Sequence, residues 1–318
     1  MKVEKDKKMA ETFVALGVEF DLSETTMDDP ALVVRNKPGR IEEIEKAIKR
    51  HLQVGLMSPA EASQLRGRLV FSNSQTFGRM GALAYNYLGQ KVAEGGGAWS
   101  MSQDLEWPLE WWLEQVSKAK PRRIPVGKLR RPVYIFSDGS CEPRKDNPSK
   151  LEAGYGAVMF DPEDGTLETF GGFIGDPLME LLTDDWTKKQ VVGQAELVPC
   201  LVAKKIWKRR LRGRLVMHYV DNEAAKYALI KGTSPTRDSA WLVNEFWKSE
   251  AHLGSYSWFE RVPSACNCAD DPSRGVEDVK VGRRRAVRVS LPNKIVSDLV
   301  EEWIARSRTC CIQYLEKY

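Results

Sequence analysis

Hydrophobic positions recur with a helical period along much of residues 1–118. The clearest stripe has apolar residues three or four positions apart, with charged residues between them: Ile41, Ile44, Ile48 and Leu52. This spacing predicts an amphipathic helix, and Gly55 is placed to end it. Three further stretches show the same spacing: 58–71, 80–88 and 102–116. Such stripes form the core of a helix bundle more often than they bind a cofactor, so we expect a mainly helical first part.

The second of these helices has a well-defined start. In Ser58-Pro59-Ala60-Glu61 a serine precedes a proline, and a glutamate follows three positions after the serine. This is the pattern of a capping box with proline at the first helical position, where its missing N–H costs nothing. Ahead of the helices, residues 13–20 predict one short strand, with Val33-Val34 as its returning partner.

From residue 133 onward the hydrophobic residues form short runs separated by turn residues and helical stretches. These runs predict five strands, at 133–137, 154–160, 166–173, 215–220 and 256–262. Asp164-Gly165 marks a hairpin between the second and third strands. Helical spacing predicts helices at 194–207, 223–230 and 234–250. The order β-β-β-α-β-α-α-β places an antiparallel meander before crossover connections and indicates an α/β fold with a mixed sheet and flanking helices.

We therefore expect four parts in the chain. Residues 1–118 form the smaller, mainly helical domain, and 119–132 form a basic linker that contains Pro121, Pro125 and Pro132. Residues 133–275 form the α/β domain. Residues 276–318 form a basic segment followed by an amphipathic helix after about residue 292, whose apolar positions are Ile295, Leu299, Trp303 and Ile304.

The basic residues are unevenly distributed. The net charge is only +4, from 48 basic and 44 acidic residues, and does not by itself indicate a nucleic-acid-binding protein. Two segments are strongly basic, and they contain Lys118, Lys120, Arg122, Arg123, Lys128, Arg130 and Arg131 in the first, and Arg283, Arg284, Arg285 and Arg288 in the second. Such runs are either phosphate-binding patches or solvated linker.

The cysteine pattern argues against the two features that most often stabilise small domains, a structural zinc site and a disulfide framework. None of the six cysteines forms a C-x-x-C pair or has a histidine at zinc spacing, so we expect neither a structural zinc site nor a disulfide framework. No apolar stretch is long enough to span a membrane, and the charged start lacks the apolar segment of a signal peptide. We expect a soluble intracellular protein with no membrane partner, in either the nucleus or the cytoplasm.

Four acidic residues lie at the ends of predicted elements: Asp138, Glu196, Asp221 and Asp270. Each has an ordinary explanation, because aspartates are common in turns and at helix caps and a glutamate favours the first turn of a helix. Together they indicate more, since parallel neighbours in the sheet bring Asp138 and Asp221 side by side and the intervening helix carries Glu196 to both. Clustered carboxylates repel one another unless cations neutralise them, and oxygen ligands suit Mg²⁺ or Mn²⁺.

Residues 130–275 resemble a ribonuclease H domain of the kind attached to retroelement reverse transcriptases. The matching strings include Ser137-Asp138-Gly139-Ser140, Gln194-Ala195-Glu196 and Val220-Asp221-Asn222. The most specific match is 267–274, which has the pattern Asn-x-Ala-Asp-x-x-Ser-Arg.

The first part resembles the region that follows the palm of such polymerases: the primer-grip hairpin, thumb and connection. This resemblance rests on Phe13-Val14-Ala15-Leu16-Gly17 and on Leu65-Arg66-Gly67-Arg68-Leu69. The catalytic Tyr-x-Asp-Asp of the palm does not occur, and Met27-Asp28-Asp29 lies in the wrong order to replace it. We therefore expect no polymerase activity from this chain alone, and an upstream polymerase domain of the same element as a partner.

The resemblance implies a metal-dependent endonuclease that hydrolyses the RNA strand of RNA–DNA hybrids. It implies two Mg²⁺ ions, with Mn²⁺ as a substitute, held by the catalytic residues Asp138, Glu196, Asp221 and Asp270, with Asp138 as the bridging ligand. It also implies six contacts with the hybrid: Ser140, Asn222, Asn267, Arg274, Arg130 and Arg131.

The chain also departs from the family pattern. Many members carry a histidine shortly before the last aspartate, whereas here His252 is better explained as a helix-end residue and His218 as a core residue. We expect residues 176–189 to form an insertion beside the site, in which Asp184-Asp185 is surface charge or, as the alternative, an auxiliary metal ligand. Asp271 is an alternative to Asp270 if the helix register differs. The rival to an enzyme is a non-catalytic nucleic-acid-binding remnant of a retroelement polyprotein; an integrase-like transferase or a proofreading-type exonuclease fits the acidic pattern poorly.

Overall fold

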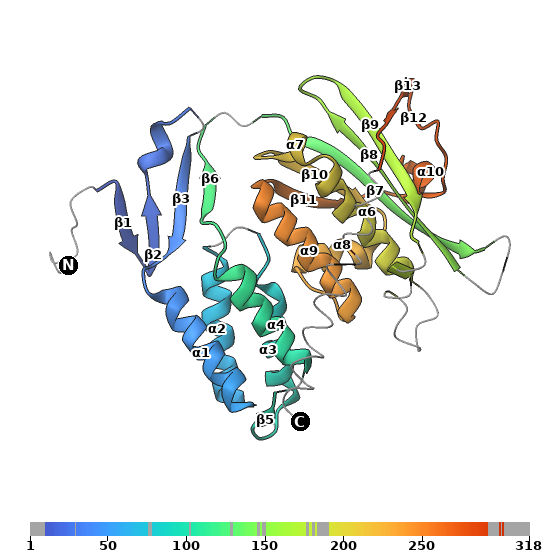
Figure 1. Cartoon of the computed structure of the whole chain (residues 1–318). Coiled ribbons are helices and arrows are strands. Elements are labelled where there is room, and N and C mark those ends of the chain that lie inside the picture. Colours follow the sequence, from blue (N-terminus) through green and yellow to red (C-terminus); the bar gives the residue numbers. More distant parts are fainter. Residues whose placement is uncertain are drawn as a thin grey trace. The chain divides into compact units, whose positions relative to one another are not determined.

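The computed structural model describes residues 10–28, 30–75, 78–101, 103–127, 130–144, 147, 151–175, 178–179, 182, 191–291, 299 and 301. The chain divides into two compact units, Met1–Leu129 and Arg130–Tyr318 (Figure 1). The first unit ends inside the segment predicted as a linker. The predicted C-terminal helix lies outside the described residues except for Leu299 and Glu301, and so does most of the expected insertion, including Asp184-Asp185.

The helices of the first unit follow the hydrophobic pattern. They are α1 (Arg40–Val54), α2 (Pro59–Asn73), α3 (Ala82–Glu94) and α4 (Gln103–Trp111), which continues as a π-helical turn, η3 (Trp112–Val116). Gly55 ends α1 in a left-handed conformation, with φ 68°, as the sequence predicts. The capping box at the start of α2 is confirmed, because Glu61 N–H donates to Ser58 Oγ and Ser58 N–H donates to Glu61 Oε2.

A four-stranded antiparallel sheet accompanies these helices, in the order β1-β2-β3-β6. Its strands are β1 (Thr12–Ala15), β2 (Val18–Asp21), β3 (Ala31–Asn36) and β6 (Arg122–Pro125). The single strand predicted at 13–20 is wrong: it is a hairpin, because Leu16 (φ 50°) and Gly17 (φ 78°) form a two-residue turn with positive φ at both positions. Strand β6 lies within the predicted linker and pairs with β3, with Val33 opposite Arg123. The unit also contains η2 (Ser23–Thr26) and the strand pair β4 (Leu56–Met57) and β5 (Trp99–Ser100).

The second unit has the predicted mixed sheet, in the order β11-β10-β7-β8-β9-β14. Its strands are β7 (Val133–Pro143), β8 (Leu151–Asp161), β9 (Thr166–Phe173), β10 (Leu215–Val220), β11 (Tyr256–Arg261) and β14 (Val287–Arg288). β7, β8 and β9 form the antiparallel meander, and β10 runs parallel to both β7 and β11. The predicted α/β class, with its mixed sheet and flanking helices, is confirmed. One boundary is wrong: β7 extends beyond Ser137, because its pairing with β8 continues as far as Pro143 opposite Leu151.

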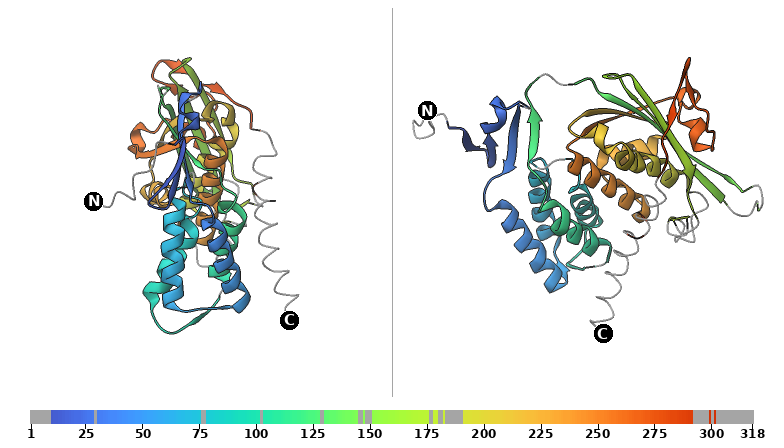
Figure 2. Two further views of the ribbon diagram at one scale, coloured as in Figure 1. Left: turned by 90° about the vertical axis from the view of Figure 1, so that its left-hand side faces the viewer. Right: turned by 45° about the horizontal axis from the view of Figure 1, so that its top comes forward.

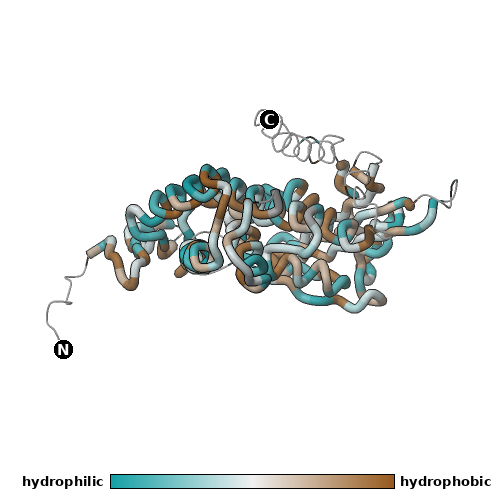
Figure 3. Tube along the Cα trace, turned by 90° about the horizontal axis from the view of Figure 1, so that it is seen from below, coloured by the Kyte–Doolittle hydropathy of each residue, from teal (hydrophilic) through white to brown (hydrophobic). Residues whose placement is uncertain are grey.

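Helices α6 (Val192–Ile206) and α9 (Arg237–Leu253) cover one face of this sheet (Figures 1 and 2). Cys200 of α6 contacts Ser137 of β7, and Phe246 of α9 lies against His218 of β10, with their ring centroids 6.2 Å apart. α7 (Lys208–Leu211) and α8 (Glu223–Lys231) flank β10 in sequence. Hydrophobic and hydrophilic stretches alternate along the chain in Figure 3, as amphipathic elements require.

The opposite face carries the short helix α10 (Asp270–Ser273) and the hairpin of β12 (Lys280–Val281) and β13 (Arg284–Arg285). Val279 and Ala286 at the base of this hairpin pack against Val158 and Leu167 of the sheet. η4 (Ser264–Cys266) precedes α10. No helix in the described part of the chain is long and apolar enough to cross a membrane.

Candidate metal centre

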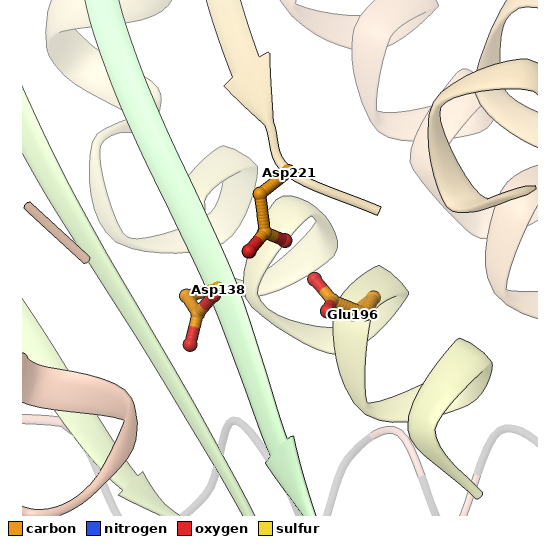
Figure 4. A group of neighbouring side chains, drawn as sticks. All are labelled: Asp138, Glu196 and Asp221. Carbon is orange, nitrogen blue, oxygen red and sulfur yellow. The ribbon is translucent and has the colours of Figure 1, made fainter. Parts of the chain in front are cut away.

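Three carboxyl groups meet where β7, β10 and α6 converge. Val220, the last residue of β10, pairs with Ser137, so Asp221 and Asp138 lie next to one another at the following positions. Glu196 approaches from α6. One oxygen from each of Asp138, Glu196 and Asp221 lies within 4.8 Å of the others (Figure 4).

Gly139 allows α6 to come this close to β7. A Cβ atom at this position would lie 2.3 Å from the backbone carbon of Ala195 and 2.4 Å from the backbone nitrogen of Glu196, which no real side chain tolerates. The Gly139 N–H also points at the site and donates to Glu196 Oε2 at 3.3 Å. The glycine after Asp138 is therefore required by helix-to-strand packing, and Asp138 lies within the strand instead of at the end or in a turn.

The carboxyl groups are poorly hydrated. Asp138 and Glu196 are each only 4% exposed. Burial, followed by the charges of Asp221 and Asp270, raises the pKa of Asp138 to about 6, although the hydrogen bond from Ser273 acts in the opposite direction. Burial, followed by the charges of Asp221 and Asp138, raises the pKa of Glu196 to about 9. Without a cation, Glu196 therefore keeps its proton at neutral pH, whereas Asp138 is mostly ionised.

The donor set fits a hard divalent cation. Within the described part of the chain, none of the three carboxyl groups forms an ion pair with a lysine or arginine, and Asp221 Oδ1 is buried with no N–H or hydroxyl donor; the hydrogen bond of the Asp221 side chain is to the carboxyl group of Glu196. A buried, unpartnered carboxylate oxygen is costly unless something positive binds it. Oxygen ligands of this kind suit Mg²⁺ or Mn²⁺.

Asp138 has two further partners on the side of the sheet that carries α10. Asn267 Nδ2 donates to Asp138 Oδ1 at 3.1 Å and to the Ser137 carbonyl at 3.2 Å. Ser273 Oγ donates to Asp138 Oδ2 at 2.6 Å. Each oxygen of the Asp138 carboxylate therefore accepts one hydrogen bond from the protein.

The fourth predicted ligand, Asp270, is not part of this group. It is the first residue of α10, its side chain is 46% exposed, and it pairs with Arg274 Nε at 3.0 Å. Its charge still contributes to the raised pKa of Asp138. Asp271, the predicted alternative, is exposed as well. The structure thus brings three of the four predicted carboxylates together and leaves the fourth half-exposed on α10.

The residues predicted to contact nucleic acid fall into two classes. Three are engaged within the protein: Ser140 Oγ donates to the Ser273 carbonyl, Asn222 Oδ1 caps α8, and Asn267 binds Asp138. The three arginines are exposed: Arg130, Arg131 and Arg274. Arg274 is 49% exposed and pairs with Asp270 and Glu142, while the Arg131 N–H donates to Glu163.

His218 and His252 lie where the sequence predicts. His218 is fully buried in the core and His252 is exposed at the end of α9. The described cysteines, Cys141, Cys200, Cys266 and Cys268, are all free thiols. The sequence prediction gave no role to Ser273 or to the glycines of β8 and β9, although Ser273 belongs to the Asn-x-Ala-Asp-x-x-Ser-Arg string.

No protein-family model matches the chain, and no curated protein matches it. Several solved structures are similar. They include RNase H1 from the halophilic archaeon Halobacterium salinarum NRC-1, with 18% identity over 46% of this chain and 97% of that chain and a TM-score of 0.33. LC11-RNase H1, isolated from compost, in complex with an RNA/DNA hybrid has 16% identity over 45% of this chain and 94% of that chain, with a TM-score of 0.34. The protease-reverse transcriptase of prototype foamy virus has 13% identity over 79% of this chain and 38% of that chain, with a TM-score of 0.35. At these identities the likeness concerns the fold alone.

Proposed function

We propose that this chain is a divalent-cation-dependent endonuclease of the ribonuclease H type, which hydrolyses the RNA strand of RNA–DNA hybrids. The observation that carries the proposal is the convergence of Asp138, Glu196 and Asp221 within 4.8 Å, with an unpartnered buried oxygen on Asp221. The resemblance of residues 130–275 to retroelement ribonuclease H domains supplies the substrate class and the origin as part of a reverse transcriptase. The upstream polymerase domain of the same element is the proposed partner.

The protein side chains have distinct tasks in this proposal. Asp138, Glu196 and Asp221 would hold the two Mg²⁺ or Mn²⁺ ions, and the resemblance to ribonuclease H domains makes Asp138 the candidate for a ligand shared by both. Asp270 completes the set from the exposed side. The bound cations supply Lewis-acid activation of water and charge stabilisation at the phosphate that is cleaved.

The exposed arginines are the proposed contacts with the hybrid. Arg274 directly follows α10 as its C-cap residue, where a phosphate could compete with its partners Asp270 and Glu142. Arg130 and Arg131 are exposed just before the start of β7, whereas Glu142, the partner of Arg274, lies near the other end of that strand. Hybrids are recognised mainly through backbone shape and 2′-hydroxyl groups, so we expect little sequence preference.

Cleavage of an end-labelled RNA–DNA hybrid in the presence of Mg²⁺ tests the proposal. We expect the parent protein to cut the RNA strand and Asp138→Asn to be inactive while retaining its fold by circular dichroism. If parent and variant are equally inert while both bind the hybrid, the enzyme proposal is wrong and a non-catalytic nucleic-acid-binding remnant is the better description.

A matched pair tests the fourth ligand. Asp270→Asn and Asp271→Asn change neighbouring residues of α10 by the same single atom, and both side chains reach solvent. We expect the first to reduce cleavage strongly and the second to have little effect. The reverse result would assign the role to Asp271.

A further inference from the structure

We infer that Ser273 is a positioning residue whose hydroxyl group fixes the carboxylate of Asp138 for cation binding. The inference rests on the proposed function, because it concerns the same cation site. Ser273 is fully buried, and its Oγ lies 2.6 Å from Asp138 Oδ2, although the two residues are 135 positions apart in the chain. A hydroxyl that donates to a charged carboxylate makes a short, strong hydrogen bond.

The part of the sheet beneath α10 consists largely of glycines, and their lack of side chains lets α10 pack closely and places Ser273. A Cβ atom at Gly154 would lie 2.0 Å from the Ser273 carbonyl oxygen, and one at Gly156 would lie 2.4 Å from the Ser273 nitrogen. A Cβ atom at Gly171 would lie 2.1 Å from the Pro272 carbonyl oxygen. Three glycines on neighbouring strands thus let the backbone of α10 rest directly on the sheet. This contact brings the Ser273 side chain within reach of β7.

The Ser273 hydroxyl has one proton and two acceptors within reach. The Asp270 carbonyl lies 2.8 Å from Oγ, and the Asp138 carboxylate is nearer and charged. With Ser273 at Oδ2 and Asn267 at Oδ1, both oxygens of Asp138 are oriented. An ionised carboxylate has about four acceptor sites, so about two remain for cations. The Asp138 side chain therefore presents a fixed set of free lone pairs towards Glu196 and Asp221.

A purely structural role for Ser273 makes a different prediction from a positioning role. If the hydroxyl only ties α10 to the sheet, its removal lowers stability and leaves the affinity of the folded protein for cations unchanged. If it orients Asp138, its removal lowers that affinity in a protein that is still folded. Loss of a group that orients a metal ligand typically weakens metal binding by about tenfold to a hundredfold.

The test is Mn²⁺ binding to the full chain, measured by calorimetry and by the paramagnetic resonance signal of free Mn²⁺. We compare the parent, Ser273→Ala and the control Thr169→Val. Thr169 is also a fully buried hydroxyl residue of the same sheet, but its Oγ1 donates to the Ala157 carbonyl and not to a carboxylate. We expect Ser273→Ala to weaken Mn²⁺ binding by about tenfold or more, and Thr169→Val to leave it unchanged.

The cleavage assay gives a second readout. In Ser273→Ala we expect the Mn²⁺ concentration that gives half-maximal cleavage to rise by a similar factor, with a smaller change in the rate at saturating Mn²⁺. If Ser273→Ala proves to be unfolded, Ser273→Cys keeps a side chain of similar shape with a much weaker donor, and the same weakening is expected there.

The outcomes separate this inference from the proposed function. If the parent binds Mn²⁺ and Ser273→Ala binds it equally well, or if both variants weaken binding to the same extent, the positioning role is overturned and the proposed function stands. If the parent binds no Mn²⁺, both the cation-dependent function and the role of Ser273 are overturned.

Discussion

Glu196 and Asp138 are carboxyl groups held almost out of contact with water, beside a third carboxyl group from Asp221. Bringing these carboxyl groups together costs electrostatic free energy in the folded state, because β7, α6 and β10 position Asp138, Glu196 and Asp221 whether or not a cation is present. In the cation-free state, ionisation of these buried carboxyl groups lowers the free energy of unfolding of the protein. The pH dependence of stability should therefore report on the site directly.

The first prediction concerns Glu196→Gln in the absence of divalent cations. The pKa of Glu196 rises from 4.5 to about 9 on folding, so the unfolded chain releases its proton first as the pH increases. The free energy of unfolding of the parent should fall between about pH 5 and pH 9, by up to about 1.4 kcal/mol per pH unit. The variant should lose most of this slope because its amide does not titrate.

Urea denaturation in the presence of a chelator, at several pH values in this window, measures the effect. Glu277→Gln is the matched control, since Glu277 is exposed and should leave the slope as it is in the parent. Equal slopes in the parent and in Glu196→Gln would contradict the assignment of the raised pKa to this residue.

The second prediction concerns a buried ion pair away from the site. The Lys204 ammonium group bonds to the Glu250 carboxylate, both side chains are completely buried, and Ser255 and Ser257 donate further hydrogen bonds to Glu250. Lys204→Met leaves the carboxylate without its counter-charge and should lower the free energy of unfolding by about 3–5 kcal/mol. The double variant Lys204→Met/Glu250→Leu should recover much of that loss, because no isolated charge remains.

Chemical denaturation of the two variants beside the parent checks this prediction. A double variant that is as unstable as the single one would show that the loss comes from packing and not from the unpaired charge.

At the scale of elements, the site depends on two close approaches that glycines permit. Gly139 lets α6 reach β7, and the glycines of β8 and β9 let α10 lie on the opposite face. Both approaches bring a polar group to Asp138 or Glu196 from a distant part of the chain. An added methyl group at these positions should therefore disturb the site as well as the packing.

The third prediction compares Gly171→Ala with Gly193→Ala. A Cβ atom at Gly171 would lie 2.1 Å from the Pro272 carbonyl oxygen, whereas one at Gly193, in the first turn of α6, would meet nothing within 4 Å. Gly171→Ala should lower the free energy of unfolding by about 1–3 kcal/mol through overpacking and should weaken Mn²⁺ binding by displacing Ser273. Gly193→Ala should be neutral or stabilising by up to about 1 kcal/mol, since alanine favours a helix.

Denaturation curves and Mn²⁺ titrations of both variants provide the measurement. Equal stabilities for the two variants would mean that α10 adjusts to the added methyl group without cost.

At the scale of the whole molecule, the chain has two units, each with its own buried core. Leu69 is fully buried in the first unit, and the carboxylate cluster belongs entirely to the second. Separate cores are expected to unfold as separate cooperative units. A ligand stabilises only the unit whose folded state binds it.

The fourth prediction is that calorimetry shows two unfolding transitions that respond to different changes. Mg²⁺ should raise the melting temperature of one transition in the parent and leave it unchanged in Asp138→Asn. Leu69→Ala should lower the other transition, because it removes about 2–5 kcal/mol from the helical core of the first unit. A single transition that shifts with both changes would show that the units unfold as one.

Much of the fold could be predicted because it depends on short-range patterns. Ile44 and Ile48 predict α1 through their spacing, and Ser58 with Glu61 predicts the start of α2 through a local cap. The predictions that were wrong depended on pairing between strands. The hairpin at Leu16-Gly17 is local, but its Leu-Gly turn lacks the usual Asn-Gly or Asp-Gly signal. The extension of β7 past Asp138, and the strand β6 that no pattern predicted, are each defined by a partner strand elsewhere in the chain.

For the candidate site, the sequence by itself determined where the acidic residues lie relative to the predicted strands and helices. From those positions it also predicted that Asp138 and Asp221 would be neighbours. Strand order is sufficient for this, because parallel pairing of β7 and β10 aligns the two residues. The sequence also predicted that the intervening helix carries Glu196 to them, and only the tertiary structure decided how close Glu196 comes, that Asp270 remains half-exposed, and that Ser273 binds Asp138. These outcomes depend on how closely α6 and α10 approach the sheet. That approach is determined by steric contact at Gly139, Gly156 and Gly171. These glycines can be recognised as necessary only when the backbone that packs against them is known.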